Sequence, residues 1–438
     1  MKIPTLFPGI VIVALSGCQT PSSNDNRSPG SIDLSPVPTQ AAHYSIPSSA
    51  GVEQLVSHAL QHHPALVAAG QKINRLQAKV AQEQALPDPK ARISAGSLAE
   101  TAAGQVDAMA GVEQAIPFPG KRRAKANAAQ KEADAARAER ENLKLRIAER
   151  VRFAYWDYYL AAQNQRISRE SKEVLKTIEE VVQARVKANQ GTQADLLRIS
   201  TEISKVDQQL IAARQQTGSA KATLNALLNR PSHSSLPYPK RSSVPSSSKL
   251  DSLIARAESA HPSVKAGQAR LTAFQHRLRN AKLDAYPDFL IGAQHSWVSE
   301  SGLSPVANGH DQTMFTLGMT LPLWQKPRQA KIREAEAGIA EMQASIANSR
   351  AELRQRVEDA WFRANSSREM IALFDTRLIP DAQQAHELAL QAYSVGTQSF
   401  VDVIDTWRLL LKFQLQQEGN RASLGKASAS LRSAAAIR

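Results

Sequence analysis

Three groups of residues in this sequence of 438 residues have types and spacings that could carry out chemistry. Asp402 and Asp405 lie three positions apart, so a helix would place both carboxylates on one face, where they could attract cations. The alternative is that they cap the start of a helix, where the helix dipole favours aspartate. His58 and His62 lie four positions apart, a spacing at which two imidazoles can bind one metal ion. Cys18, the only cysteine, could be modified covalently.

The histidines are weak evidence for a metal centre. No cysteine and no cluster of carboxylates accompanies them, and only His63 recurs, as His261, in both cases directly before a proline. No Ser-His-Asp arrangement, phosphate-binding loop or pair of catalytic carboxylates stands out either. We therefore predict no metal, no cofactor and no enzymatic activity.

The residues before Cys18 indicate a lipoprotein signal peptide over residues 1–17. Lys2 supplies a positive charge, an apolar run from Leu6 to Leu15 follows, and two small residues precede the cysteine. The run is too short to span a bilayer. We predict that the mature chain begins at Cys18 with a lipid on its thiol, the alternative being an ordinary buried cysteine in a leader. Gln19 follows where aspartate would signal inner-membrane retention, and resemblance to known lipoproteins suggests that this favours sorting to the outer membrane.

The formal net charge is +14, which raises the possibility of nucleic-acid binding. The charges are distributed along helical stretches as mixed pairs, such as Lys131 with Glu132, and do not gather in one basic patch. We predict solvated helix faces and no nucleic-acid partner.

Two polar stretches divide the chain. Residues 18–50 are rich in Pro, Ser, Asn and Gln and predict a flexible linker behind the lipid. A second such stretch, 231–249, separates residues 51–230 from residues 250–438.

These two parts are repeats of one another. Leu55 matches Leu253 and His63 matches His261 at a constant offset of 198. Three further matches pair Leu86-Pro87-Asp88 with Tyr286-Pro287-Asp288, Ile116-Pro117 with Leu321-Pro322, and Ala154-Tyr155-Trp156 with Ala360-Trp361-Phe362. The same structural plan is therefore expected twice.

Each repeat predicts two strands followed by a long helix. Alternating apolar residues predict strands at Ala91–Leu98, Met109–Ile116, from Phe289 and at Phe315–Leu321. Long helices are predicted over Gly120–Gln190, which contains no proline, and over Arg328–Val395, where Pro380 should kink or break the helix. In the second of these, apolar residues recur every seventh position from Ile332 to Ala360, the spacing of a coiled coil. Shorter helices are predicted at 52–85, 192–229, 250–285 and from 398 to the C-terminus.

Four strands per chain cannot close a pore. No run of 18 apolar residues follows the leader, so only strands could cross a bilayer. An open four-stranded sheet would leave backbone groups unpaired in hydrocarbon, and a closed barrel needs about eight strands or more. Several chains must therefore contribute to one barrel if the strands insert.

With these features the sequence resembles the outer membrane factor family, the TolC-like channels of tripartite efflux and type I secretion. The most specific matches are residues 114–122, which read Gln-Ala-Ile-Pro-Phe-Pro-Gly-Lys-Arg, and residues 392–397 followed by 401–405. The resemblance covers Val52 to the C-terminus. It implies an α+β membrane protein in which three chains share one twelve-stranded β-barrel and long coiled-coil helices form a periplasmic α-barrel.

The resemblance implies roles for residues at the junction between barrel and helices, namely Pro117, Pro119, Gly120, Lys121, Arg122 and Pro322. Lys121, Arg122 and Arg123 stand at the start of a helix, the wrong end for positive charge on dipole grounds. We expect them to meet lipid phosphates or carboxylates at the outer membrane, the alternative being a solvated face.

The resemblance also implies two turns at the periplasmic tip, which contain Asn189, Gly191, Asp195, Tyr393, Gly396 and Thr397. Gly396 suits a left-handed helix end, and Asn189, its counterpart, tolerates that conformation. Tyr393 is expected to hydrogen-bond to Asp195 as a latch of the closed state.

Threefold symmetry would place six carboxylates, from Asp402 and Asp405, around a narrow periplasmic aperture. Arg198 stands where the first repeat would carry the counterpart of Asp405. The second repeat is therefore expected to carry the aperture, while the first mainly completes the wall.

The implied function is a passive exit duct of the outer membrane, gated at its periplasmic tip. Its implied partners are two further copies, a periplasmic adaptor (membrane fusion protein), outer-membrane lipid and an inner-membrane transporter. The resemblance implies that this transporter is of the RND type. The Pro-Gly-Lys-Arg segment is similar to the branch paired with heavy-metal pumps. The alternative is a lipid-anchored periplasmic coiled-coil adaptor or scaffold.

Overall fold

The computed structural model describes residues 46–47, 49–241, 249–300, 306 and 308–437, all within a compact unit that spans Ala41–Arg438. Cys18, the predicted signal peptide and most of the predicted linker lie outside the described residues. Ile46 and Ala50 pack against a buried cluster, so ordered packing begins before Val52.

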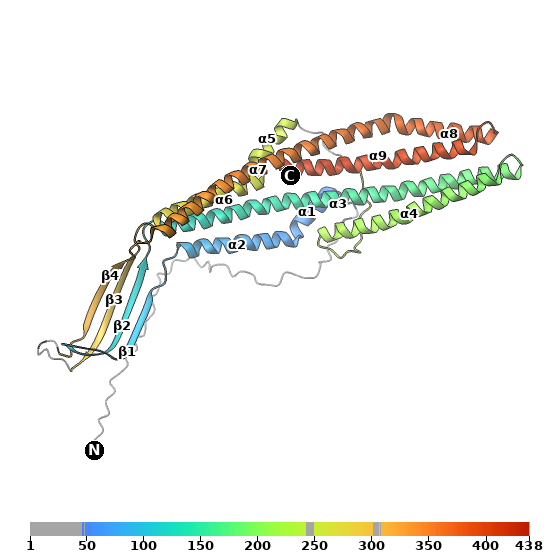
Figure 1. Ribbon diagram of the computed structural model, residues 1–438. Helices are drawn as coiled ribbons and strands as arrows, with labels where there is room; N and C mark the ends of the chain where they lie inside the picture. The colour runs from blue at the N-terminus through green and yellow to red at the C-terminus, as the bar shows by residue number, and fades with distance from the viewer. Residues whose placement is uncertain (1–45, 48, 242–248, 301–305, 307, 438) are drawn as a thin grey trace, which may run out of the picture. The chain divides into compact units, whose positions relative to one another are not determined.

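The four predicted strands form one antiparallel sheet (Figure 1). Its strands are β1 (Lys90–Thr101), β2 (Gly104–Ile116), β3 (Phe289–Ser299) and β4 (Gln312–Met319), in the order β1-β2-β3-β4. The hairpin of each repeat is thus joined to the other through β2 and β3. Among the described strands, β1 and β4 are the two edges.

The register gives the sheet one apolar and one polar face. Val112 lies opposite Ala293, which lies opposite Phe315, and Ile291 lies opposite Leu317. Paired residues project to the same side of a sheet, so this face is apolar across all the strands. The opposite face carries mainly glycine and polar residues, among them Arg92, Gly111, Gln294, Ser296 and Thr316.

The helices follow the predicted plan with additional breaks. The first repeat contains α1 (Val52–His62), α2 (Pro64–Gln84), α3 (Lys121–Lys187) and α4 (Gln193–Leu227). The second contains α5 (Leu250–Ala260), α6 (Pro262–Leu283), α7 (Gln325–Leu373), a π-helical turn η1 (Phe374–Leu378), α8 (Ile379–Val395) and α9 (Phe400–Ala434). No helix within the described part of the chain is sufficiently long and apolar to span a membrane.

The single helices predicted at 52–85 and 250–285 are wrong, because each is divided before a proline. Pro64 and Pro262 occupy the first turns of α2 and α6, where a missing backbone N–H costs least. His63 and His261 are extended and cap these helices, each accepting a hydrogen bond at Nδ1 from the backbone N–H two residues later, at 3.2 Å. The predicted break near Pro380 is present, as the π-helical turn η1.

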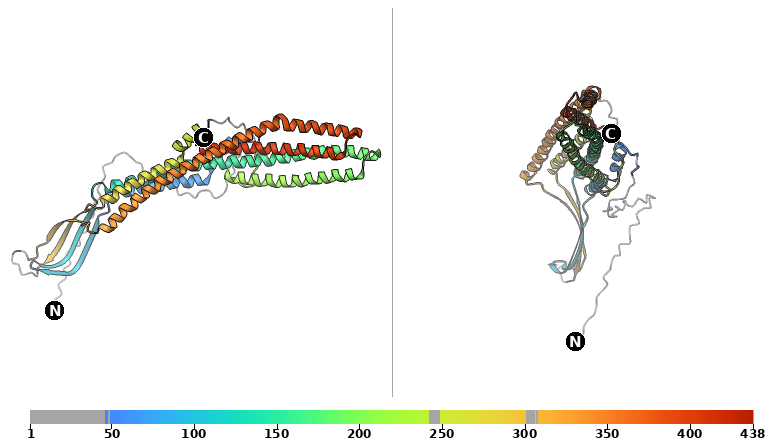
Figure 2. Two further views of the ribbon diagram at one scale, coloured as in Figure 1. Left: turned by 45° about the horizontal axis from the view of Figure 1, so that its top comes forward. Right: turned by 90° about the vertical axis from the view of Figure 1, so that its right-hand side faces the viewer.

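Helix α3 is the central packing element. It contacts α1, α2 and α4 of its own repeat and α6 and α9 of the other, whereas α7 contacts α5, α6 and α9. Equivalent residues of the repeats fill two equivalent cores: Leu55 lies in the first and Leu253 in the second. A third core joins the far ends of α3, α4, α8 and α9, whose pairing Figure 2 shows from two sides.

Candidate functional site

Two chain reversals close the helical pairs α3–α4 and α8–α9. Gly396 ends α8 with φ 87° and Asn189 follows α3 with φ 54°, so both adopt the expected left-handed conformation. Thr397 donates its N–H to the carbonyl of Ala392 at 2.9 Å. Gly191 lies in the first turn, where a Cβ would meet the backbone nitrogen of Val186 at 3.2 Å. Both reversals therefore depend on residues that tolerate a left-handed backbone, and the first also needs the small size of a glycine at position 191.

Each returning helix begins with the same capping arrangement. The hydroxyl of Thr192 donates to Asp195 at 2.7 Å, and the hydroxyl of Ser399 donates to Asp402 at 2.7 Å. In both cases the carboxylate also accepts the backbone N–H of the capping residue. Helix capping, the alternative role considered for Asp402, is therefore present, and Asp195 has the same role in the first repeat.

The expected latch between Tyr393 and Asp195 is wrong. The Tyr393 hydroxyl is buried without a hydrogen-bond partner among the described residues, and the Asp195 carboxylate instead accepts the hydroxyl of Thr192. Burial raises the pKa of Tyr393, and so does the charge of Asp195, while Arg185 opposes them. The Arg185 guanidinium lies 4.7 Å from the centre of the Tyr393 ring.

Arg185 instead connects the two reversals. It donates to the carbonyl oxygen of Tyr393 in one and to that of Gln190 in the other, the latter at 2.9 Å. Arg185 stands near the end of a helix, where backbone carbonyl groups lack partners within the helix. This position is the one feature of the sequence that indicates a role for Arg185 in binding carbonyl oxygens.

A second connection joins α4 to α9. Arg408 donates to Glu202 at 2.5 Å and to Asp405 at 3.0 Å, and Lys205 also binds Glu202, at 2.7 Å. Burial alone would raise the pKa of Glu202, but the hydrogen bonds from Arg408 and Lys205 outweigh it and lower the pKa. Glu202 is not predicted from the sequence, because the residues around it do not indicate that α9 packs against this part of α4.

The junction after β2 contains a buried ion pair. Lys121 is 7% exposed, and its ammonium contacts Asp288 at 2.8 Å and the carbonyl of Tyr286 at 2.9 Å. Asp288 also accepts the N–H of Phe118, whose ring stacks on Tyr286. Burial would raise the pKa of Asp288, but these hydrogen bonds lower it.

Of the two partners expected for Lys121, lipid phosphate or a carboxylate, the structure shows a carboxylate, that of Asp288 within the same chain. Arg122 donates to the carbonyl of Gln84 at 3.0 Å, and Gly120 has φ 96° at the start of α3. Pro117 and Pro119 line a crevice beside them. At the second junction the carbonyl of Pro322 accepts a hydrogen bond from Arg328.

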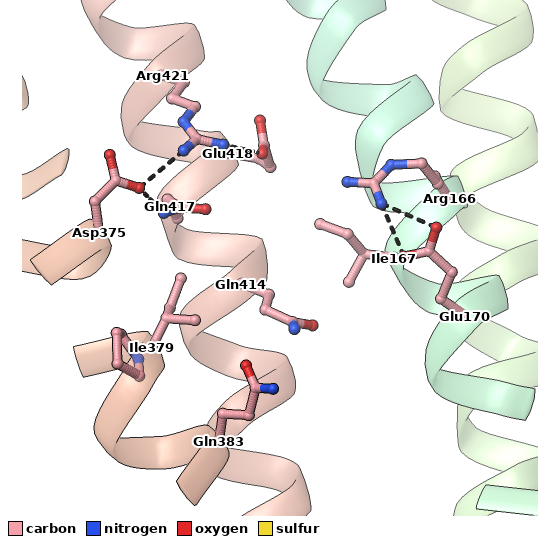
Figure 3. A pocket seen from close by; sticks show the side chains of 11 residues that line it. Arg166, Ile167, Glu170, Asp375, Ile379, Gln383, Gln414, Gln417, Glu418 and Arg421 are labelled. Carbon is pink, nitrogen blue, oxygen red and sulfur yellow. Dashed lines mark hydrogen bonds and ion pairs between the residues drawn. The ribbon is translucent and has the colours of Figure 1, made fainter. Parts of the chain in front are cut away.

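A polar cavity of about 360 Å³ lies beside the π-helical turn (Figure 3). Arg421 joins Glu418 at 2.6 Å to Asp375 at 2.9 Å, and the Tyr159 hydroxyl donates to Glu418 at 2.7 Å. Burial and the adjacent Glu418 raise the pKa of Tyr159. This network connects η1 to α9 and α3.

The histidines considered as metal ligands have other contacts in the described part of the chain. His58 and His62 are in ring contact with centroids 4.7 Å apart, and His63 serves as a helix cap. No group of three or more His, Cys, Asp or Glu side chains suited to a metal ion occurs among the described residues.

An amphipathic four-stranded sheet joined to long helical pairs defines the class of TolC-like outer-membrane channels. The family model for outer membrane efflux proteins matches residues 55–230 and 253–436, and the chain belongs to this family. It is an outer-membrane channel component of a tripartite efflux system, in which an adaptor and an inner-membrane transporter take part, and it extends into the periplasm.

Individual proteins support this assignment. The pyoverdine export outer membrane protein OpmQ of Pseudomonas putida is 25% identical over 88% of this chain and 85% of its own. The outer membrane protein VceC of Vibrio cholerae has a TM-score of 0.73 at 20% identity, covering 88% of this chain and 95% of its own. The open MtrE channel of Neisseria gonorrhoeae has a TM-score of 0.71 at 18% identity, covering 88% of each.

Proposed function

We propose that the chain is one subunit of a homotrimeric exit duct that is anchored by lipid at Cys18. The observation that carries this proposal is a sheet with one apolar face and two open edges. In hydrocarbon each unpaired edge group would be costly, so the edges must meet other strands. Three copies would supply twelve strands, enough to close a barrel with the apolar face toward lipid.

We further propose that the two reversals form the periplasmic gate. Arg185 and Arg408 hold the two helical pairs of one chain together at this end. Asp402 and Asp405 begin the returning helix of the second repeat, and in a trimer six such carboxylates would surround the aperture. Because Arg408 pairs with Asp405, we expect Asp402 to contribute more of the negative field.

The proposed partners act at the two ends of the subunit. The turns around Asn189 and Gly396 would receive the periplasmic adaptor, and the inner-membrane transporter would be of the RND type. Arg123, which is exposed at the first junction, would contact lipid phosphate. The relative OpmQ is named for pyoverdine export. For this chain we propose a passive role, in which the inner-membrane transporter selects the cargo.

Conductance in planar bilayers tests the duct and its gate. Purified oligomer should form cation-selective channels, and the double variant Asp402→Asn with Asp405→Asn should lose most of that selectivity. Asp251→Asn, in the first turn of α5, is the matched control and should leave selectivity unchanged. An absence of channels from both wild type and double variant would contradict the proposal.

The lipid anchor is tested by fractionation. Because the strands would hold the chain in the bilayer, Cys18→Ser should lose its lipid but remain in the outer-membrane fraction. Release of this variant as a soluble protein would instead indicate a scaffold held only by its lipid.

A further inference from the structure

The structure fixes the alignment of the two repeats residue by residue. In the returning helices α4 and α9, Asp195 matches Asp402 and Gly218 matches Gly425 at an offset of 207. Beyond these helices the same offset pairs Asn229 with Ala436, and both have positive φ, at 55° and 52°. At the junctions and in the long helices the counterparts follow the matches of Pro87-Asp88 with Pro287-Asp288, Ile116-Pro117 with Leu321-Pro322 and Ala154-Tyr155-Trp156 with Ala360-Trp361-Phe362, whose offsets are 200, 205 and 206.

One contact between the repeats lies at the junction. Lys121 of the first repeat binds Asp288 of the second. By the repeat alignment, Lys326 is the counterpart of Lys121 and Asp88 is the counterpart of Asp288. Lys326 and Asp88 are both exposed, and neither side chain has a hydrogen bond or ion pair within the described part of the chain. The chain thus carries both halves of a second ion pair, without forming it internally.

A second contact between the repeats lies between α3 and α9. The Trp156 ring packs directly against Gly425, where even a Cβ would overlap it. The counterparts are Phe362, which is 60% exposed, and Gly218, which is exposed and has no heavy atom within 4 Å of a Cβ position. An aromatic ring and the glycine that would receive it are again present, unpaired.

We propose that a second copy of this chain occupies this surface, with Lys326 against Asp88 and Phe362 against Gly218 of the next copy. The inference rests on the proposed trimer and assigns the residues of its interface. Within the chain the first repeat docks on the second through β2–β3, α3–α6 and α3–α9. If neighbouring copies repeat this arrangement, β4 of one copy lies beside β1 of the next copy, and α7 lies beside α2 and α4 of the next copy. The free edges and the complementary charges agree with that arrangement.

A lipid or an unrelated protein on this surface would explain fewer of these observations than a second copy does. Lipid phosphate would suit Lys326 but not the acidic Asp88, and neither would explain why an aromatic ring and a glycine recur at the positions of an internal contact. A second copy explains both pairs with one symmetry operation.

A charge exchange tests the junction pair. Lys326→Glu and Asp88→Lys should each speed dissociation of the purified trimer by at least roughly tenfold, because each leaves two like charges facing one another. The double variant should recover most of the wild-type rate. Lys249→Glu, an exposed lysine at the start of α5, should have no effect. If the single variants only destabilised the fold, combining them would not restore the wild-type rate of dissociation.

Cross-linking tests the second pair. Gly218→Cys combined with Phe362→Cys should give covalent dimers and trimers with a short bis-maleimide, whereas Lys249→Cys with Phe362→Cys should not. If trimers form but neither cross-links nor recovery by charge exchange are found, this interface is wrong. If light scattering finds only monomers in mild detergent, the proposed trimer itself fails.

Discussion

The two repeats follow one plan, yet equivalent residues have different surroundings. Trp156 is buried whereas Phe362 is exposed, and Lys121 is buried whereas Lys326 is exposed. Both differences have the same direction, because α3 has the other repeat beside it while α7 lies at the edge of the chain. The different exposure of these side chains therefore comes mainly from whether another repeat packs beside them within the chain, and less from differences in sequence between the repeats.

Other differences are changes of sequence. Helix α3 is continuous over Lys121–Lys187, but its counterpart is interrupted by η1, which Arg421 fastens to α9. Arg408 corresponds to Thr201, and its partner Glu202 corresponds to Leu409. Because Thr201 and Leu409 are uncharged, the repeat-related counterpart of the Arg408–Glu202 ion pair cannot form. The second repeat therefore carries features of its own, one where α8 begins and one between α9 and α4.

The largest expected effect separates the two glycines that face aromatic rings. Gly425→Ala should lower the free energy of unfolding by about 3 kcal/mol, because the new methyl group overlaps Trp156 in a close-packed site. Thermal or urea unfolding of the purified protein measures it. Gly419→Ala, in the same helix with open space around it, should change stability by about 1 kcal/mol or less.

Gly218→Ala sharpens the same comparison. In detergent-separated monomers it should behave like Gly419→Ala, since nothing lies within 4 Å of its Cβ position. Equal losses at Gly425 and Gly419 would show that the Trp156 contact is unimportant to stability.

A smaller effect should distinguish the two histidine caps by pH. Burial lowers the pKa of His261 to about 4 from 6.5, with the charge of Arg356 contributing in the same direction. The unfolded chain therefore binds the proton more readily, so stability present above pH 6.5 is lost as the pH falls toward 4. We expect a loss of about 2 kcal/mol between pH 7 and pH 5 from this one group.

His261→Asn should remove that pH dependence, because asparagine can still accept the N–H of Ser263 but does not titrate. Burial also lowers the pKa of His63, but His63 is only half-buried, so His63→Asn should flatten the profile less. Unfolding midpoints measured across this pH range check both. An equal effect of the two variants would contradict the proposed difference in burial.

The elements that the sequence predicted depend on local signals. Alternation identified the four strands, the absence of proline identified α3, and Pro380 marked the interruption of the second long helix. Gly396 and Asn189 were recognised because few other residues tolerate positive φ. The His-Pro pairs stand out as repeats, but no capping role is predicted for them, although a residue before a helix-starting proline is a natural cap.

The contacts that were missed join residues distant in sequence. Lys121 and Asp288 are separated by 167 positions, and Arg408 and Glu202 by 206. Such pairs depend on which helix lies beside which, and periodicity within one helix does not contain that information. Spacing alone singles out Asp402 and Asp405, but the pairing of Arg408 with Asp405 is visible only in the structure.

The smallest expected effect concerns the ion pair that only one returning helix provides. Arg408→Met should lower stability by about 1 kcal/mol, because Glu202 is buried but keeps Lys205, and Arg408 is itself half-exposed. Loosening α4 from α9 should also raise the open probability of the channel in planar bilayers. Arg198→Met is the matched control, since Arg198 is exposed on α4 without an ion pair in the described part of the chain. If both variants open the channel equally, the loss of charge at this end explains the change, and the Arg408–Glu202 pair does not hold the helical pairs together.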